Sequence, residues 1–145
     1  MRVLIDTNAI ISNMQKSRGD HAAVGATLRE LVLRAHEPCI CAQIVHEFWV
    51  VATRPADGNG LGLEPQQAAN EIDRLLAAFT LISEPADMLT RWRAFCVNNS
   101  VRGKRAHDAR IATLMIASGV LSIVTNNVSD FQGWPDVRTI VPVAE

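Results

Sequence analysis

Short apolar runs alternate with longer stretches of helical periodicity along this chain. Runs typical of strands buried on both faces occur at 3–5, 38–41, 80–82, 121–125 and 138–141. Apolar residues recur at helical spacing over 9–14, 20–36, 42–53, 66–78, 86–98 and 105–118. Because strands alternate with helices, the pattern predicts an α/β fold, a three-layer sandwich with a central, mainly parallel sheet flanked by helices.

Glycine and proline mark the breaks between these elements. Pro55 disfavours continuation of the helix over 42–53, and Gly119 suits the C-terminal cap of the helix over 105–118. Residues 54–65 form a Gly/Pro-rich loop of a length typical of functional lids or of mobile segments. The stretch NNVSDFQGWPD before the last strand is rich in turn residues.

The length of 145 residues predicts one domain over 1–145, large enough to fold without disulfides or a structural metal. With 48% hydrophobic and 20% charged residues, the composition excludes disordered and collagen-like classes. No apolar run reaches the ~18 residues of a membrane span. The N-terminus lacks the apolar segment of a signal peptide, so we expect a cytoplasmic protein. Neither Cys-x-x-Cys nor paired histidines occur, which argues against zinc.

The charges are unevenly distributed. The chain has a net charge of −1, yet residues 91–110 carry six cations against one carboxylate, which leaves the remainder acidic. A basic patch on an acidic body is typical of a protein that binds a polyanion. A solvated face with salt bridges is the alternative explanation.

Asp6 and Glu47 occupy positions that packing alone does not favour. Asp6 directly follows the first strand, at the edge where open parallel sheets bind ligands, although capping of the next helix explains it equally well. Glu47 lies within the apolar stripe of its helix, beside Phe48 and Val51. A carboxylate there must be paired or bind a metal, and a buried ion pair is the alternative to a metal.

Asp108 and Asp130 repeat this pattern. Asp108 shares a helix face with Ile111 and Met115, although a carboxylate in the first turn also stabilises the helix dipole. Asp130 follows a strand together with Asn127, and ordinary turn chemistry is the alternative there.

Together the four acids predict a cation site, since each lies near the carboxyl edge of the predicted sheet. Carboxylates that converge repel one another, and an all-oxygen set without Cys or paired His suits Mg²⁺ or Mn²⁺. Such ions polarise a phosphoryl oxygen and lower the pKa of a bound water, which indicates phosphodiester hydrolysis. The chain has no phosphate-loop, dinucleotide-binding or nucleophile-elbow motif.

The acidic motifs also resemble those of a known family. LIDTN, VHEF, HDARIA and TNNVSDF occur in the order and spacing of the acidic motifs of PIN-domain ribonucleases, over essentially the whole chain. The short, single-domain length resembles VapC-type toxins of toxin–antitoxin pairs. The resemblance implies a central parallel sheet, cleavage of RNA that depends on Mg²⁺ or Mn²⁺, an antitoxin partner and a homodimer.

The resemblance also assigns roles to individual residues. The quartet that holds the metal corresponds to Asp6, Glu47, Asp108 and Asp130. Thr7 is expected to hydrogen-bond a metal-bound water. Asn127 stands where relatives often have Asp, so the number of metal ions, one or two, stays open. The RNA backbone is expected to lie on the basic residues Arg102, Lys104, Arg105 and Arg110.

Other functions remain as alternatives to a toxin nuclease. A PIN-like RNA-binding or scaffold module would keep the fold without turnover, and a housekeeping RNA-processing nuclease would cleave without toxicity. A receiver-type signalling domain would need an acidic pair after the first strand, where this chain has Asp-Thr-Asn. The target RNA is not predicted, because phosphate contacts position a strand without selecting its sequence.

Overall fold

The elements of the fold follow one another in the alternating order that the hydrophobic pattern predicts. The structure, a computed structural model, describes residues 1–142. The strands are β1 (Arg2–Ile5), β2 (Glu37–Cys41), β3 (Thr80–Ile82), β4 (Ser122–Val124) and β5 (Arg138–Ile140). The α-helices are α1 (Thr7–Met14), α2 (His21–Leu33), α3 (Ala42–Thr53), α4 (Pro65–Ala78), α5 (Met88–Asn98) and α6 (Arg105–Ser118). Two 3-10 turns, η1 (Ala56–Gly58) and η2 (Val128–Phe131), complete the order.

The five strands form one sheet in the order β3-β2-β1-β4-β5, and every pairing is parallel. The first strand lies at its centre, where Leu4 is in register with Cys39 on one side and Ile123 on the other. The predicted α/β fold with a parallel sheet is therefore confirmed. Since all strands point the same way, the loops that follow β1, β2 and β4 meet at one edge of the sheet.

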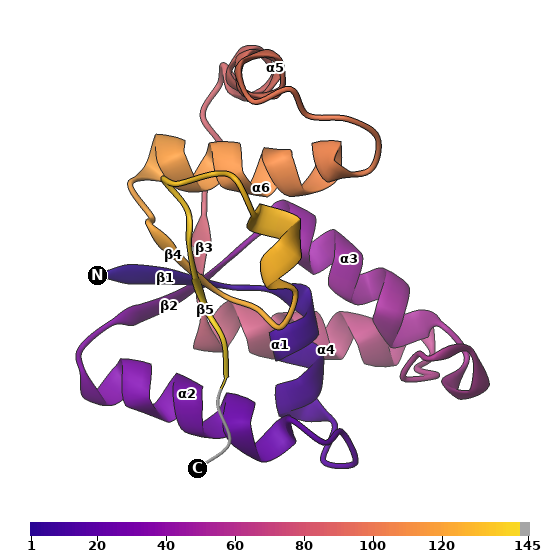
Figure 1. The fold of residues 1–145 in the computed structure, drawn as a ribbon. Helices are drawn as coiled ribbons and strands as arrows, with labels where there is room; N and C mark the ends of the chain where they lie inside the picture. Colours follow the sequence, from indigo (N-terminus) through magenta and orange to yellow (C-terminus); the bar gives the residue numbers. More distant parts are fainter. Residues whose placement is uncertain (143–145) are drawn as a thin grey trace.

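Helices cover both faces of this sheet. In Figure 1, α5 and α6 lie above it, while α1, α2 and α4 lie below it. The strands are buried on both faces, and the largest fully buried side chains include Leu4, Ile5, Ile40, Phe48, Leu114 and Ile123. None of the helices in residues 1–142 is long and apolar enough to cross a membrane.

Several element boundaries differ from the predicted ones by one to three residues. The first helix begins at Thr7 because Asp6 caps it, two residues before the predicted start. The helix predicted over 20–36 ends at Leu33, since Ala35 adopts a left-handed backbone with φ 60°. The strand predicted over 121–125 covers Ser122–Val124.

The Gly/Pro-rich loop after α3 is folded back onto the end of that helix. The Leu61 amide donates to the carbonyl of Val51 at 3.0 Å, and the Gly62 amide donates to the carbonyl of Arg54 at 2.8 Å. The Gly60 amide donates to the carbonyl of Pro55 at 3.0 Å, which closes the turn around η1. The loop is thus fixed to α3 by backbone hydrogen bonds.

We expect Gly60→Ala to lower the free energy of unfolding by about 1–3 kcal/mol, the usual cost of overpacking. A Cβ atom at Gly60 would lie 2.3 Å from the carbonyl oxygen of Arg54, a backbone atom that cannot turn aside. Gly58→Ala is the matched control, because the nearest atom to a Cβ there is 3.9 Å away, on Pro55. Chemical denaturation of both variants tests this, and equal stabilities would contradict it.

Candidate functional site

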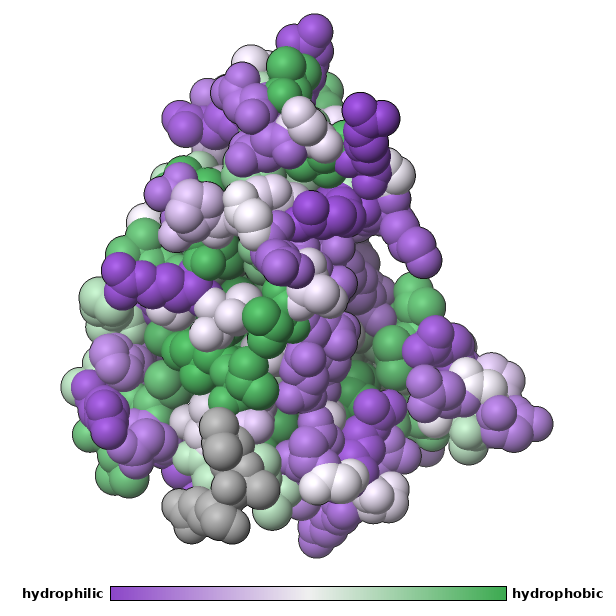
Figure 2. Space-filling model, viewed as in Figure 1, coloured by the Kyte–Doolittle hydropathy of each residue, from purple (hydrophilic) through white to green (hydrophobic). Residues whose placement is uncertain are grey.

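A cavity of about 360 Å³ lies at the carboxyl edge of the sheet, and all four acids named above line it. Asp6 directly follows β1, and Asp130 lies in η2 beyond β4. Glu47 lies on α3, which follows β2, and Asp108 lies in the first turn of α6, which leads into β4. In Figure 2, polar residues form a column over the surface between η2 and α3. The parallel topology therefore brings together carboxylates that are far apart in the sequence.

Asp6 is the most enclosed of the four, with 7% of its surface exposed. Its Oδ1 accepts the backbone amide of Thr7 at 2.8 Å, and its Oδ2 accepts the hydroxyl of Thr125 at 2.8 Å and the amide of Asn8 at 3.3 Å. Burial raises the pKa of Asp6, and the charges of Glu47 and Asp130 raise it further, whereas the hydrogen bonds from Thr125 and from the Thr7 backbone lower it. Asp6 therefore both caps α1 and presents a carboxylate to the cavity.

Glu47 is held by hydrogen bonds on both carboxylate oxygens. The Thr7 hydroxyl lies 3.1 Å from Oε2, and the Gln43 amide donates to Oε1 at 3.2 Å. The Thr7 hydroxyl also lies 3.4 Å from the carbonyl of Ile44. The single proton of the Thr7 hydroxyl is thus directed toward α3, and the hydroxyl oxygen can still accept a hydrogen bond from a water.

A chain of polar contacts continues outward from Glu47. The Gln43 amide also donates to the carbonyl of His107 at 2.8 Å, which ties α3 to the start of α6. Arg110 donates to the Gln43 side-chain oxygen at 3.3 Å and pairs with Glu84 at 2.7 Å. Arg110 therefore stabilises the position of Glu47 through Gln43.

Asp108 is half-buried at the start of α6. The pKa of Asp108 is raised from an ordinary 3.8 to about 6, and burial is the largest cause. The negative charges of Asp130, Asp6 and Glu47 also raise it, whereas the Arg105 guanidinium lowers it. The raised pKa of Asp108 thus reflects its burial first and the repulsion by the neighbouring acids second.

We expect Asp108 to make the metal-free protein less stable as the pH rises from about 4 to about 6. Because the pKa is raised in the folded state, the folded protein binds more protons than the unfolded chain between 3.8 and about 6. The free energy of unfolding therefore falls through this window. Denaturation in EDTA across this range, for wild type and Asp108→Asn, isolates the effect, and a constant difference between the two would contradict it.

Asp130 and Asn127 reach the cavity from the segment after β4. The Asn127 amide donates to the Thr125 hydroxyl at 3.0 Å, and the Asp130 amide donates to the carbonyl of Asn127 at 3.1 Å. Arg105 holds this segment from α6, since its guanidinium donates to the carbonyl of Gln132 at 2.6 Å. The same group also lies near the Asp130 carbonyl, at 3.5 Å.

Arg105 also stacks on an aromatic ring, and its guanidinium carbon lies 4.3 Å from the ring centroid of Trp134. Its Nε is buried and has no hydrogen-bond partner within residues 1–142. The half-buried guanidinium is therefore engaged with other groups of the protein, and its hydrogen bonds hold the backbone that carries Asp130.

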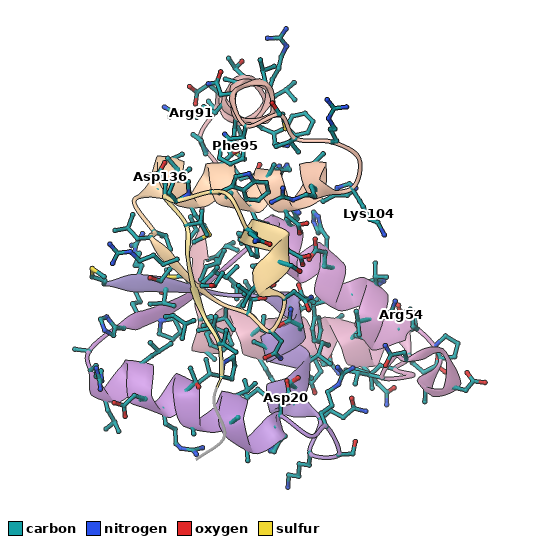
Figure 3. The ribbon with its side chains drawn as sticks, in the orientation of Figure 1. Asp20, Arg54, Arg91, Phe95, Lys104 and Asp136 are labelled. Carbon is teal, nitrogen blue, oxygen red and sulfur yellow. The ribbon has the colours of Figure 1, made fainter. Side chains whose placement is uncertain are left out.

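The other predicted RNA contacts differ in exposure. Arg102 and Lys104 are exposed on the connection between α5 and α6, and Lys104 projects from that connection in Figure 3. Arg110 is half-buried in the pair with Glu84 described above. None of the four basic residues Arg102, Lys104, Arg105 and Arg110 lines the acidic cavity.

Five residues near the four acids were missed by the sequence analysis. These are Asn8, Arg18, Gln43, Arg54 and Thr125. Gln43 precedes Glu47 by one helical turn, and this spacing could have identified it. Asn8 and Thr125 lie inside the quoted acidic motifs. Arg18 and Arg54 lie in loops, where no periodicity marks them, and only the folded chain places them in the cavity.

The carboxylate set fits a hard divalent cation in its chemistry. Carboxylate oxygens are the ligands of Mg²⁺ and Mn²⁺, and the four acids repel one another. No three His, Cys, Asp or Glu side chains of residues 1–142 are arranged to hold one metal ion together. Mg²⁺ usually keeps several waters and binds through one or two carboxylates, so such an arrangement is compatible with it.

Sequence comparison identifies a family. The PIN domain matches residues 3–132 of the chain. Among curated proteins, no sequence matches this chain.

Solved structures share this fold along nearly the whole chain. VapBC2 from Rickettsia felis, solved bound to a DNA fragment from its promoter, is similar with a TM-score of 0.72 and 18% identity, covering 97% of this chain and 98% of that chain. VapBC-1 from nontypeable Haemophilus influenzae has a TM-score of 0.71 and 19% identity, with the same coverage. VapC20 from Mycobacterium tuberculosis, a toxin that cleaves the sarcin–ricin loop, has a TM-score of 0.63 and 16% identity, covering 94% and 98%. At these identities the likeness establishes a common fold.

Proposed function

Because the chain belongs to the PIN domain family, whose members are typically metal-dependent nucleases, we propose that it is a metal-dependent endoribonuclease. It hydrolyses RNA phosphodiester bonds, and residues 1–145 form one nuclease domain. The observation that carries the proposal is the convergence of four carboxylates on one cavity at the carboxyl edge of the sheet. This edge is where α/β proteins bind ligands.

The acids hold Mg²⁺ or Mn²⁺ in this proposal. The residues that would bind the metal, directly or through its coordinated waters, are Asp6, Glu47, Asp108 and Asp130. When bound, a divalent cation polarises a phosphoryl oxygen and lowers the pKa of a coordinated water. The donor chemistry and the raised pKa values of Asp6 and Asp108 support this assignment.

The surrounding residues of the chain keep these carboxylates in place. Thr125 and the backbone of Thr7 fix the two oxygens of Asp6, and the Thr7 hydroxyl and Gln43 fix those of Glu47. The Thr7 oxygen accepts a hydrogen bond from a water in the cavity. Asn127, which lines the same cavity, offers a neutral amide to that water or to the substrate.

The basic segment contacts the RNA backbone. Arg102 and Lys104 are exposed and donate to phosphates directly. Arg105 and Arg110 have partners within the protein and add positive potential, which attracts the polyanion over a longer range. Phosphate contacts of this kind bind RNA without selecting its sequence.

The biological role we propose is that of the toxin of a toxin–antitoxin pair, acting on cytoplasmic RNA. Support comes from structural neighbours solved as toxin–antitoxin complexes, whose length this chain matches almost completely. A cognate antitoxin and a homodimer follow from this proposal. Exposed apolar side chains on two helices, Val32 and Leu33 on α2 and Trp49 and Val50 on α3, provide surface for such partners.

A cleavage assay tests the proposed activity. We expect purified protein to degrade total bacterial RNA with Mn²⁺ and to leave it intact with EDTA. Binding of the ion to the folded state should also raise the free energy of unfolding, by about 2.7 kcal/mol at 100 times the Kd. A protein that melts unchanged with Mn²⁺ and leaves RNA intact would contradict the proposal and favour a binding or scaffold module.

A further inference from the structure

We propose that Arg18 and Arg54 form a second anion site in the acidic cavity, which binds a phosphodiester of the RNA one or two nucleotides from the bond that is cleaved. This inference rests on the proposed function and specifies which residues hold the RNA strand beyond the carboxylates. Both arginines line the cavity that the four acids line.

The two arginines keep their charge available to a ligand. Neither one lies within ion-pair distance of a carboxylate in the part of the chain that the structure describes. They face the same cavity as four acids and yet stay apart from them. A cavity lined by carboxylates and by guanidinium groups that are not paired with them suits a ligand that brings a cation to the first and an anion to the second.

Arg18 is held in place before any ligand binds. Its Nε donates to the side-chain oxygen of Gln15 at 2.7 Å, which leaves the two terminal nitrogens free to bind an anion as a pair. The connection that carries Arg18 is fixed by Asp20, whose Oδ2 accepts the Ser12 hydroxyl at 3.0 Å and the side-chain amide of Asn126. Figure 3 shows Asp20 at this connection between α1 and α2.

Arg54 is positioned by the loop that follows α3. Its backbone carbonyl accepts the Gly62 amide, and Gly60 packs directly against that carbonyl. Its Nη2 donates to the Asn59 carbonyl at 3.4 Å, and Asn59 also lines the cavity. Figure 3 shows Arg54 beyond the end of α3. The tight loop thus directs an exposed guanidinium toward the cavity.

Two apolar side chains, Val51 and Ile11, line the cavity together with the charged groups. Val51 lies one turn after Glu47 on α3, and Arg54 is the extended residue at which that helix ends, about 10 Å along its axis from Glu47. Ile11 belongs to α1. Carboxylates, apolar side chains and guanidinium groups thus line one cavity. This combination suits a strand of RNA, in which a ribose and its base separate successive phosphates.

Binding of RNA in EDTA tests this site without turnover. The probe is a short fluorescein-labelled single-stranded RNA of mixed sequence, and fluorescence anisotropy gives its Kd over a range of salt. We expect Arg18→Gln/Arg54→Gln to bind about tenfold more weakly at low salt and to lose about one unit of the slope of log K against log salt. Arg18→Lys/Arg54→Lys keeps the charges and should keep most of that slope.

The matched control is Arg29→Gln/Arg138→Gln, which removes two exposed arginines outside the cavity and should bind as the wild type does. Melting curves confirm that each variant is folded. A wild-type Kd and slope for Arg18→Gln/Arg54→Gln, or an equal loss in the control, would overturn the site. If Arg18→Gln/Arg54→Gln still bound RNA as the wild type does but no longer captured the antitoxin, the RNA site would also be overturned. The two arginines would then be assigned to binding an acidic peptide of that partner. Cleavage with Mn²⁺ by the wild type tests the proposed function separately.

Discussion

Replacing Asp6 by asparagine is expected to reduce RNA cleavage by more than about 100-fold while the protein stays folded. Asparagine keeps the shape of the side chain but removes a hard anionic ligand, and even an outer partner of a metal ligand contributes about 10–100-fold. The fold should persist because Asn also caps helices well and because the buried charge, whose pKa is raised, is removed.

The control for this variant is Asp136→Asn, which removes one carboxylate from an exposed position outside the cavity. Figure 3 shows Asp136 near the far end of α6, on the opposite side of the molecule from Arg54. Initial rates with Mn²⁺ and melting curves should be measured for all three proteins, purified identically. Cleavage by Asp6→Asn at the wild-type rate would refute the assignment of the acids.

Expression of the chain alone in bacteria is expected to arrest growth, and co-expression of the proposed antitoxin is expected to restore growth. An unrestrained nuclease with an exposed acidic cavity cleaves RNA that the cell needs. An arginine from a partner suits the task of restraint, since guanidinium pairs bidentately with carboxylates and displaces the metal. An apolar helix of the same partner would cover Trp49 and Val50 on α3, which are 37% and 55% exposed.

The second part of this experiment takes as the test partner any small reading frame found directly upstream of the gene. Asp6→Asn should be harmless and should still co-purify with that partner, whereas Trp49→Ser/Val50→Ser should be toxic but captured less well. Asp136→Asn should behave as the wild type does in both assays. Harmless expression of soluble, folded wild type without a captured partner would exclude the toxin role and favour a housekeeping RNA-processing nuclease.

Most of the fold was predictable because the strands of a parallel sheet are buried on both faces and therefore have continuous apolar sequences. The helices over Ala42–Thr53 and Arg105–Ser118 and the strand over Thr80–Ile82 have the predicted bounds. Boundaries shifted where one residue decides a local geometry, as Ala35 does with its positive φ. The strand order was not predicted, because pairing between distant segments leaves no local pattern.

The acidic residues of the candidate site could be predicted from the sequence, but its arginines could not. Each acid stands next to a strand or within an apolar stripe, where a charge is conspicuous. By contrast, Arg18 and Arg54 lie in polar loops, where an arginine is unremarkable. The same limit applies to Arg105, which the sequence places in a basic patch and the structure stacks on Trp134. Charge counts along a chain do not distinguish a guanidinium facing solvent from one holding a backbone in place.

The central position of β1 has a consequence for the protein while it is being made. The hydrogen bond from Thr125 to Asp6 joins residues 119 positions apart, and β1 pairs with β4. Asp130 comes five residues after Thr125 in the chain and is synthesised after it. On a nascent chain the first acid therefore leaves the ribosome long before the strand and the acid that complete its surroundings. Such distant pairings form late in folding. The four acids are consequently not brought together until most of the chain has been made, so the nuclease activity proposed above is expected to be absent from a growing chain.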